Sequence, residues 1–261
     1  MTFCSTRAAI ELDDERLLRY SRHILLDEIG VAGQEKILAA HVLVIGAGGL
    51  GSPVALYLAA SGVGTLTIVD DDVVDLTNLQ RQIVHNAERV GANKAVSAAQ
   101  TLQALNPDTR VVAVTQRAEG DELSALVAAA DVVIDCCDNF ATRHAVNRAC
   151  VLLGKPLVSG AATRFDGQLT VFDPREAASP CYHCLFGEEG EASDGPCATF
   201  GVFAPLVGII GSMQAAEALK LVVGIGESPV GRLLLLDGRT MRWREMRFGK
   251  DPACPVCGGT K

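Results

Sequence analysis

Short, nearly continuous runs of apolar residues recur along the first two thirds of the chain, at 41–46, 65–70, 111–114, 131–139 and 156–161. Strands that are covered on both faces in a parallel sheet have this composition. Helical patterns separate the runs, at 52–61, 92–105, 120–129 and 140–153. This alternation predicts an α/β fold with a Rossmann-like, mostly parallel sheet and helices on both faces.

The pattern changes at both ends of this region. Residues 13–29 have an apolar face and arginines at helical spacing, which predicts one amphipathic helix that ends at Gly30, followed by a short helix over 34–40. The alternating segment 167–172 predicts an antiparallel strand. Further on, we expect a mobile acidic loop at 187–195, a largely buried helix at 204–223, and a hairpin formed by 232–237 and 241–248.

Composition narrows the class of protein. The 261 residues are 49% hydrophobic and 21% charged, which excludes a disordered chain. The net charge of −8 argues against non-specific binding to nucleic acid or to an anionic membrane. The uncharged run 197–216 is as long as a membrane span, but glycines and a proline interrupt it, so we expect a buried helix. No secretory signal pattern opens the sequence, and this favours a cytoplasmic location.

A glycine-rich motif, GAGGLG at 46–51, stands between a predicted strand and a predicted helix. Gly46, Gly48 and Gly51 allow the backbone to turn sharply and to approach a phosphate, while the helix N-terminus supplies free N–H groups. Asp70 ends the next strand, where its carboxylate could accept the ribose hydroxyls. The motif therefore predicts nucleotide binding. The alternative is a glycine turn that only packs the helix on the strand.

Charged residues after this motif favour a triphosphate over a dinucleotide. Asn78, Arg81 and Lys94 follow Asp70, and two cations exceed what a pyrophosphate needs beside a helix N-terminus. Asp135 and Asp138 lie at the carboxyl end of a later strand, where magnesium would reconcile a carboxylate with phosphates. Other interpretations remain open: Arg81 and Lys94 as solvated charges, Asp138 or Asn139 as helix caps, and an NAD-dependent oxidoreductase.

The cysteines suggest a metal site. Cys181 and Cys184 form one CxxC pair, and Cys254 and Cys257 form another. Four thiolates suit a closed, structural zinc site with tetrahedral geometry. Free or redox-active cysteines are the alternative. Cys197 follows the acidic loop, and a thiol in that setting is a candidate nucleophile.

Several motifs, in order, resemble the ubiquitin-activating-like adenylyltransferases, the HesA/MoeB/ThiF family. The resemblance covers about 12 to 259 and rests on RYSRHI (19–24), GAGGLGS (46–52), NLQRQ (78–82), Lys94, DCCDN (135–139), SGAA (159–162), GQLTVF (167–172), PCYHC (180–184) and CPVC (254–257). It implies that ATP and the C-terminal Gly-Gly tail of a small ubiquitin-like sulfur carrier react to an acyl-adenylate and pyrophosphate. A MoaD-like carrier for molybdenum cofactor biosynthesis is the first expectation; a ThiS-like carrier for thiamine, or another sulfur-transfer pathway, is the alternative.

The resemblance also implies roles for residues. Asp70 would hold the ribose, Asn78, Arg81 and Lys94 the phosphates, and Asp138 a magnesium ion. The expected nucleotide-binding set is Gly46, Gly48, Gly49, Asp70, Asn78, Arg81, Lys94, Asp138 and Asn139. Arg22 would reach the ATP of the other subunit of a homodimer, so the residues expected to act in catalysis are Arg22, Arg81, Lys94 and Asp138.

The resemblance further implies how the chain is organised. Residues 1–261 would form one adenylation domain, with a nucleotide-binding half at 12–165 and a carrier-binding, zinc-containing half at 166–261. Sulfur would come from a separate sulfurtransferase or cysteine desulfurase. Cys197 takes part in sulfur chemistry in some members of the family and is dispensable for adenylation in others, so its role stays open.

Overall fold

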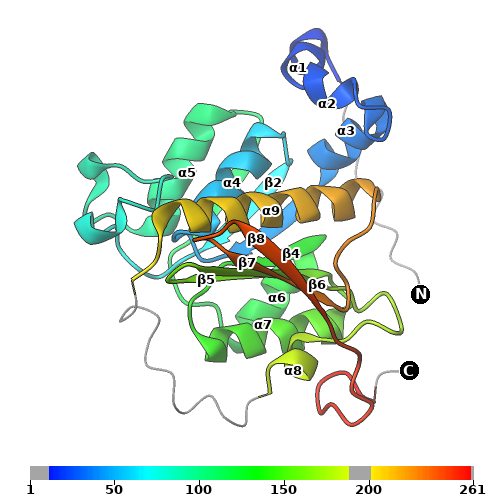
Figure 1. Cartoon of the computed structure of the whole chain (residues 1–261). Coiled ribbons are helices and arrows are strands. Elements are labelled where there is room, and N and C mark those ends of the chain that lie inside the picture. Colours follow the sequence, from blue (N-terminus) through cyan, green and yellow to red (C-terminus); the bar gives the residue numbers. More distant parts are fainter. Residues whose placement is uncertain (1–11, 188–200, 260–261) are drawn as a thin grey trace.

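The computed structural model describes residues 12–187 and 201–259, and a sheet of eight strands forms the centre of this part of the chain (Figure 1). The strand order is β3-β2-β1-β4-β5-β6-β7-β8. The first five strands are parallel: β1 His41–Ile45, β2 Thr65–Val69, β3 Arg110–Val114, β4 Val132–Asp135 and β5 Leu157–Thr163. The last three pair antiparallel: β6 Asp166–Phe172, β7 Arg232–Asp237 and β8 Arg242–Arg247. The Rossmann-like sheet and its antiparallel extension are thus confirmed.

Helices cover both faces of the parallel part (Figure 1). On one face lie α4 (Gly51–Ala60), α5 (Lys94–Leu105) and α9 (Ala204–Val223); on the other lie α6 (Gly120–Ala129) and α7 (Phe140–Leu153). Strand β1 shows why its sequence is apolar from Val42 onwards. Val42 and Val44 pack into a first core, under α4, α5 and α9, and Leu43 and Ile45 pack into a second core, under α6 and α7. Successive side chains of a strand point to opposite faces of the sheet.

The prediction of one helix over 13–29 is wrong. The chain forms α1 (Asp14–Arg19) and α2 (Ser21–Ile24), and Gly30 begins α3 (Gly30–Ala39) instead of ending a helix. Tyr20 breaks the segment because its ring is buried against Gly62, and Asn106 donates a hydrogen bond to its hydroxyl at 2.9 Å. Apolar spacing within 13–29 carries no sign of this tertiary contact.

Helix α9 is, among the described residues, the one helix long and apolar enough to cross a membrane. In this structure it packs along α4 and across β5 and β6. Its buried residues include Leu206, Ile210 and Gln214. The expectation of a buried helix over 204–223 is therefore confirmed.

The chain between β6 and α9 contains the short helix α8 (Tyr182–Leu185). Two single 3₁₀ turns, η1 (Leu76–Asn78) and η2 (Ala87–Arg89), lie between β2 and α5. The expected mobile loop at 187–195 lies, apart from Gly187, outside the described residues, as does Cys197.

Candidate nucleotide and metal sites

The carboxyl ends of β1 and β4 lie side by side, with Ile45 paired to Asp135. After β1 the chain turns towards β2 on one side, whereas β4 leads to β5 on the other, so the strand order reverses at this point. Ligands of open α/β sheets bind in the crevice outside such a reversal. The glycine-rich loop follows β1 and residues 136–139 follow β4, so the two predicted nucleotide segments meet there.

Two of the glycines are required by packing alone. Gly46 has φ +97°, and a Cβ there would lie 2.8 Å from the carbonyl oxygen of Cys136. A Cβ on Gly51 would lie 1.9 Å from the carbonyl oxygen of Gly46. Gly48 is different, because its nearest neighbour would be Gln82 Nε2 at 3.5 Å. The packing interpretation therefore explains Gly46 and Gly51. It does not explain Gly48, where a close approach by a ligand stays a prediction.

Asp70 supports the glycine-rich loop from behind. One carboxylate oxygen accepts the Ala47 N–H at 2.7 Å, and the other accepts the Asp72 N–H at 3.0 Å. Burial raises the pKa of Asp70, and these two hydrogen bonds and the Lys94 charge oppose that shift. Each oxygen keeps a second lone pair. The ribose role stays a prediction, in addition to this structural one.

Lys94 is not a solvated helix charge. It is the first residue of α5, its side chain is 7% exposed, and its Nζ lies 2.9 Å from Asp72 Oδ2. Arg81 and Asn78 form a second unit, because Arg81 Nη2 donates to Asn78 Oδ1 at 2.8 Å. Lys94 thus lies near Asp70 and the glycine-rich loop that Asp70 supports. Gln82, which follows Arg81 in the sequence, lies beside Gly48 of the same loop.

Asp138 and Asn139 have different surroundings. Asn139 caps α7: its Oδ1 accepts the Thr142 N–H at 2.9 Å and a hydrogen bond from Arg117 at 3.0 Å. The cap interpretation therefore holds for Asn139, and its predicted contact with nucleotide stays a prediction. Asp138 is exposed, and within residues 12–187 and 201–259 it has no hydrogen bond or ion pair. The described residues therefore leave all the acceptor sites of its carboxylate open.

Asp135 and Asp138 both lie at the carboxyl end of β4, as predicted, but Asp135 does not face the crevice. Asp135 is 1% exposed. Its carboxylate accepts Ser159 Oγ at 2.9 Å and the Cys137 N–H at 3.1 Å, and it pairs with Arg143. As the last residue of β4 it continues the strand alternation, which turns its side chain into the second core.

Arg22 does not reach the crevice within one chain. It is exposed on α2, and α2 packs against α1 and α3. Figure 1 shows these helices as a projection away from the sheet. A role for Arg22 at the nucleotide therefore requires a second subunit, as the sequence interpretation assumes.

The four predicted metal ligands converge. Their sulfurs all lie within 4.8 Å of one another, with Cys181–Cys254 at 3.7 Å, Cys181–Cys184 at 3.9 Å and Cys184–Cys257 at 3.4 Å. A tetrahedral zinc site with bonds of about 2.3 Å separates sulfurs by about 3.8 Å. The donor set and its spacing fit zinc.

A buried histidine escaped the sequence interpretation. His85 Nε2 lies 2.9 Å from the carbonyl oxygen of Ala47, and Nδ1 lies 2.9 Å from Ser97 Oγ, so the ring joins the glycine-rich loop to α5. Burial lowers the pKa of His85. No motif marks it, because a lone histidine in a turn region has no characteristic spacing.

Comparison with known proteins is decisive here, because a model of the ThiF family matches residues 20–256. The chain belongs to the ThiF family. It is 48% identical over 249 residues to the sulfur carrier protein ThiS adenylyltransferase of Escherichia coli, covering 95% of this chain and 98% of that protein. It is 44% identical over 251 residues to molybdopterin-synthase adenylyltransferase of E. coli, covering 95% and 99%.

A third ThiF-family relative is the SAMP-activating enzyme E1 of Haloferax volcanii, 48% identical over 250 residues, covering 95% of this chain and 92% of that protein. Among solved structures, E. coli MccB with AMPCPP and MccA superposes with a TM-score of 0.80 at 25% identity, covering 92% of this chain and 74% of that one. The resemblance to the HesA/MoeB/ThiF family is confirmed. The similar identities do not separate molybdopterin from thiamine relatives.

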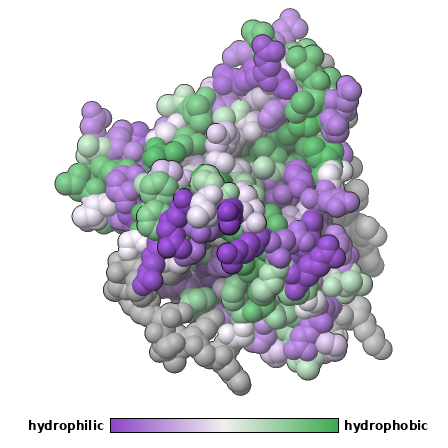
Figure 2. Space-filling view, viewed as in Figure 1, coloured by the Kyte–Doolittle hydropathy of each residue, from purple (hydrophilic) through white to green (hydrophobic). Residues whose placement is uncertain are grey.

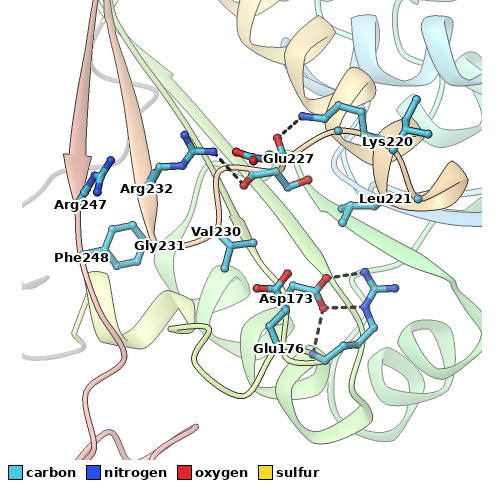
Figure 3. A pocket seen from close by; sticks show the side chains of 15 residues that line it. Asp173, Glu176, Lys220, Leu221, Glu227, Val230, Gly231, Arg232, Arg247 and Phe248 are labelled. Carbon is cyan, nitrogen blue, oxygen red and sulfur yellow. Dashed lines mark hydrogen bonds and ion pairs between the residues drawn. The ribbon is translucent and has the colours of Figure 1, made fainter. Parts of the chain in front are cut away.

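One cavity of this ThiF-family chain lies away from the nucleotide crevice (Figure 3). It has a volume of about 780 Å³ and is lined by the end of β6, the start of β7 and the loop after α9. Phe172, at the end of β6, pairs with Leu157 at the start of β5. The cavity therefore lies near the amino-terminal ends of the parallel strands, opposite the crevice at their carboxyl ends. Its cations are paired within the protein, among them Arg175 with Asp173 and Lys220 with Glu217. It is a separate feature from the predicted nucleotide site.

Proposed function

We propose that this chain is an ATP-dependent adenylyltransferase that activates the C-terminal glycine carboxylate of a small ubiquitin-like sulfur carrier. Family membership and the names of the relatives support adenylation rather than hydride transfer. In the reaction, a carboxylate oxygen attacks the α-phosphorus of ATP, the new O–P bond forms, and the α–β bridging bond breaks to release pyrophosphate. The carboxylate is ionised at neutral pH, so the site needs no general base.

The observation that carries this proposal is that a buried cation and a carboxylate with no partner among the described residues both lie at the carboxyl ends of the parallel strands. Lys94 is buried beside the glycine-rich loop, and Asp138 is exposed without a partner among the described residues. Adenylation requires charge neutralisation and positioning. Lys94, Arg81 and Asn78 would bind the phosphates and Asp70 the ribose.

Two metals belong to the proposal. Magnesium would be held by Asp138, and when bound it would offset the negative charge of the phosphates. Zinc would be held by the four cysteines, where it leaves no open coordination position and so has a structural role. The sulfur spacing described above supports the second assignment.

For the pathway, we propose a MoaD-like carrier and molybdenum cofactor biosynthesis. The relative that is named a molybdopterin-synthase adenylyltransferase supports this choice. A ThiS-like carrier for thiamine is the competing assignment, favoured by the relative that is named for ThiS. The sulfur donor would be a separate sulfurtransferase or cysteine desulfurase.

We assign residues 1–261 to one adenylation domain, with the nucleotide half at 12–165 and the carrier and zinc half at 166–261. Strand β8 ends the sheet order, and its exposed Trp243 and Met246 are available to a carrier protein. Unpaired edge strands favour added protein contacts. The packing of α9 on the sheet and the unlinked thiols Cys136 and Cys150 support a cytoplasmic location.

A homodimer completes the proposed site. Figure 2 shows hydrophobic side chains on the projecting N-terminal helices. The exposed apolar residues there are Leu17, Leu18, Leu25, Leu26 and Val31. A symmetric dimer would cover such a surface and could bring Arg22 to the partner's nucleotide.

The test is carrier-dependent exchange of labelled pyrophosphate into ATP. Purified protein is assayed with a MoaD-like carrier, with a ThiS-like carrier, and with each carrier lacking its terminal glycine. We expect exchange with the MoaD-like carrier and none with the truncated forms. Exchange with the ThiS-like carrier alone would transfer the assignment to thiamine. Absence of exchange with both would contradict the proposed function.

A further inference from the structure

A buried ion pair lies directly behind the crevice. Arg143 on α7 is 7% exposed and Asp135 at the end of β4 is 1% exposed, and Arg143 Nη1 lies 3.7 Å from Asp135 Oδ2. Moving two charges out of water opposes folding, and apolar replacements of such pairs are often neutral or stabilising. Stability alone therefore gives no reason for this pair.

Both partners hold the turn that precedes Asp138. The Asp135 carboxylate accepts the Cys137 N–H at 3.1 Å, while Arg143 Nη2 donates to the Cys137 carbonyl oxygen at 2.7 Å. The same Nη2 also donates to the carbonyl oxygen of Gly160 on β5, at 3.1 Å. The peptide groups of residue 137 are thus fixed on both sides and tied to the neighbouring strand.

The chain is fixed equally well after Asp138. Asn139 caps α7 through the Thr142 N–H, at 2.9 Å. Between these two anchors, the Asp138 side chain makes no hydrogen bond or ion pair within the described part of the chain. The main chain on either side therefore fixes the Cα of Asp138, and with it the region that the carboxylate can reach.

Helix α9 reinforces the same place from the other face of the sheet. Gln214 is fully buried and donates to the carbonyl oxygen of Asp135 at 2.7 Å. Ser159 on β5 adds the hydrogen bond to Asp135 Oδ2 noted above. The end of β4 is thus held from both faces and from β5.

We propose that Arg143, acting with Asp135, is a positioning residue that presets the Asp138 carboxylate for a magnesium–nucleotide complex. This inference rests on the proposed function for the identity of that ligand. A guanidinium suits the task because it presents several N–H groups in a fixed plane and can donate to two carbonyls and a carboxylate together. A lysine retains the charge and lacks this fork.

The test compares variants that separate position from stability. Arg143→Lys keeps the buried charge but not the bridge from Cys137 to Gly160. Asp135→Asn with Arg143→Met removes both buried charges and leaves an oxygen for the Cys137 N–H, so this double variant is expected to fold even where a single charge removal prevents it. Arg148→Met, at an exposed position on the same helix, is the matched control.

The main readout is Mn²⁺ binding in the presence of AMPCPP, followed by electron paramagnetic resonance. We expect both test variants to bind Mn²⁺ about tenfold more weakly, since supporting contacts of ligands contribute on this scale. With carrier present, kcat for pyrophosphate exchange should fall about a hundredfold, because small misplacements have effects of this size. KM for ATP should change little, and Arg148→Met should match wild type.

Thermal unfolding and amide hydrogen exchange at 136–139 complete the experiment. Faster exchange there in variants whose melting temperature stays close to wild type would support a positioning role. Wild-type Mn²⁺ affinity in Arg143→Lys or in the double variant would overturn the inference. Wild-type protein that shows no exchange with any carrier would contradict the proposed function, and the Mn²⁺–AMPCPP comparison would still decide the role of Arg143.

Discussion

Substitution of Lys94 by methionine tests the nucleotide site most directly. The substitution keeps an unbranched side chain of similar shape and removes its charge, in a residue that is 7% exposed at the start of α5. In this structure its partner is Asp72, whose side chain is 72% exposed. Loss of the cation therefore leaves Asp72 in water, and the variant should remain folded.

The expected magnitude follows from the burial of Lys94. A unit charge about 4 Å from a phosphate oxygen interacts by about 4 kcal/mol at an effective dielectric constant of about 20. A change of about 1.36 kcal/mol in the activation free energy changes the rate tenfold. Lys94→Met should therefore lower kcat/KM for pyrophosphate exchange about a thousandfold.

The control is Asp72→Asn, which removes the ion pair and leaves the cation in place. It should stay within about threefold of wild type, because an ion pair with one exposed partner contributes little. The result that would refute the reasoning is a Lys94→Met enzyme within tenfold of wild type, or equal losses in the two variants. Either would mean that Lys94 serves the pairing with Asp72 and not a phosphate.

Three further predictions concern metal, pH and assembly. Metal analysis should find one zinc per chain. Cys254→Ser should lose the zinc and show faster amide hydrogen exchange at 248–259 before exchange in the sheet changes, because metal binding is coupled to folding. Purified, reduced wild-type protein without zinc would contradict this. Burial lowers the pKa of His85 in the folded state, so below a pH of about 6.5 the unfolded chain binds more protons than the folded one. The free energy of unfolding should therefore decrease as the pH falls from about 6.5 through the pKa of the folded state. Urea titrations should show a weaker pH dependence for His85→Gln. Arg22→Ala and Asp138→Ala should each be inactive alone. When the two variants are mixed and exchange subunits, about half the dimers are hybrids with one intact site of two, so about a quarter of wild-type activity should return. Proven subunit exchange without recovery would mean that Arg22 acts within its own subunit or outside the site.

The sheet could be predicted from the sequence because its signals are local. In a strand such as His41–Ile45, the four consecutive apolar residues from Val42 onwards indicate burial on both faces. The CxxC pairs likewise restrict their own geometry, and only their meeting across 70 residues needs the fold. The break at Tyr20 had no local signal, because its cause is a hydroxyl bonded to Asn106, far along the chain.

The same distinction separates Asp135 from Asp138. Asp135 follows the apolar run 132–134 directly and Asp138 follows it three residues later, so both carboxylates are predicted at the end of the sheet where ligands bind. The two carboxylates differ because the alternation of side chains between the two faces of the sheet ends at Asp135. Asp135 is the last strand residue and turns inward, while its own carboxylate binds the Cys137 N–H and ends the strand. Asp138, one residue beyond that turn, is left exposed. A turn that is closed by a tertiary ion pair with Arg143 depends on α7 being in place, so the residue that faces the ligand is decided by packing that no local pattern records.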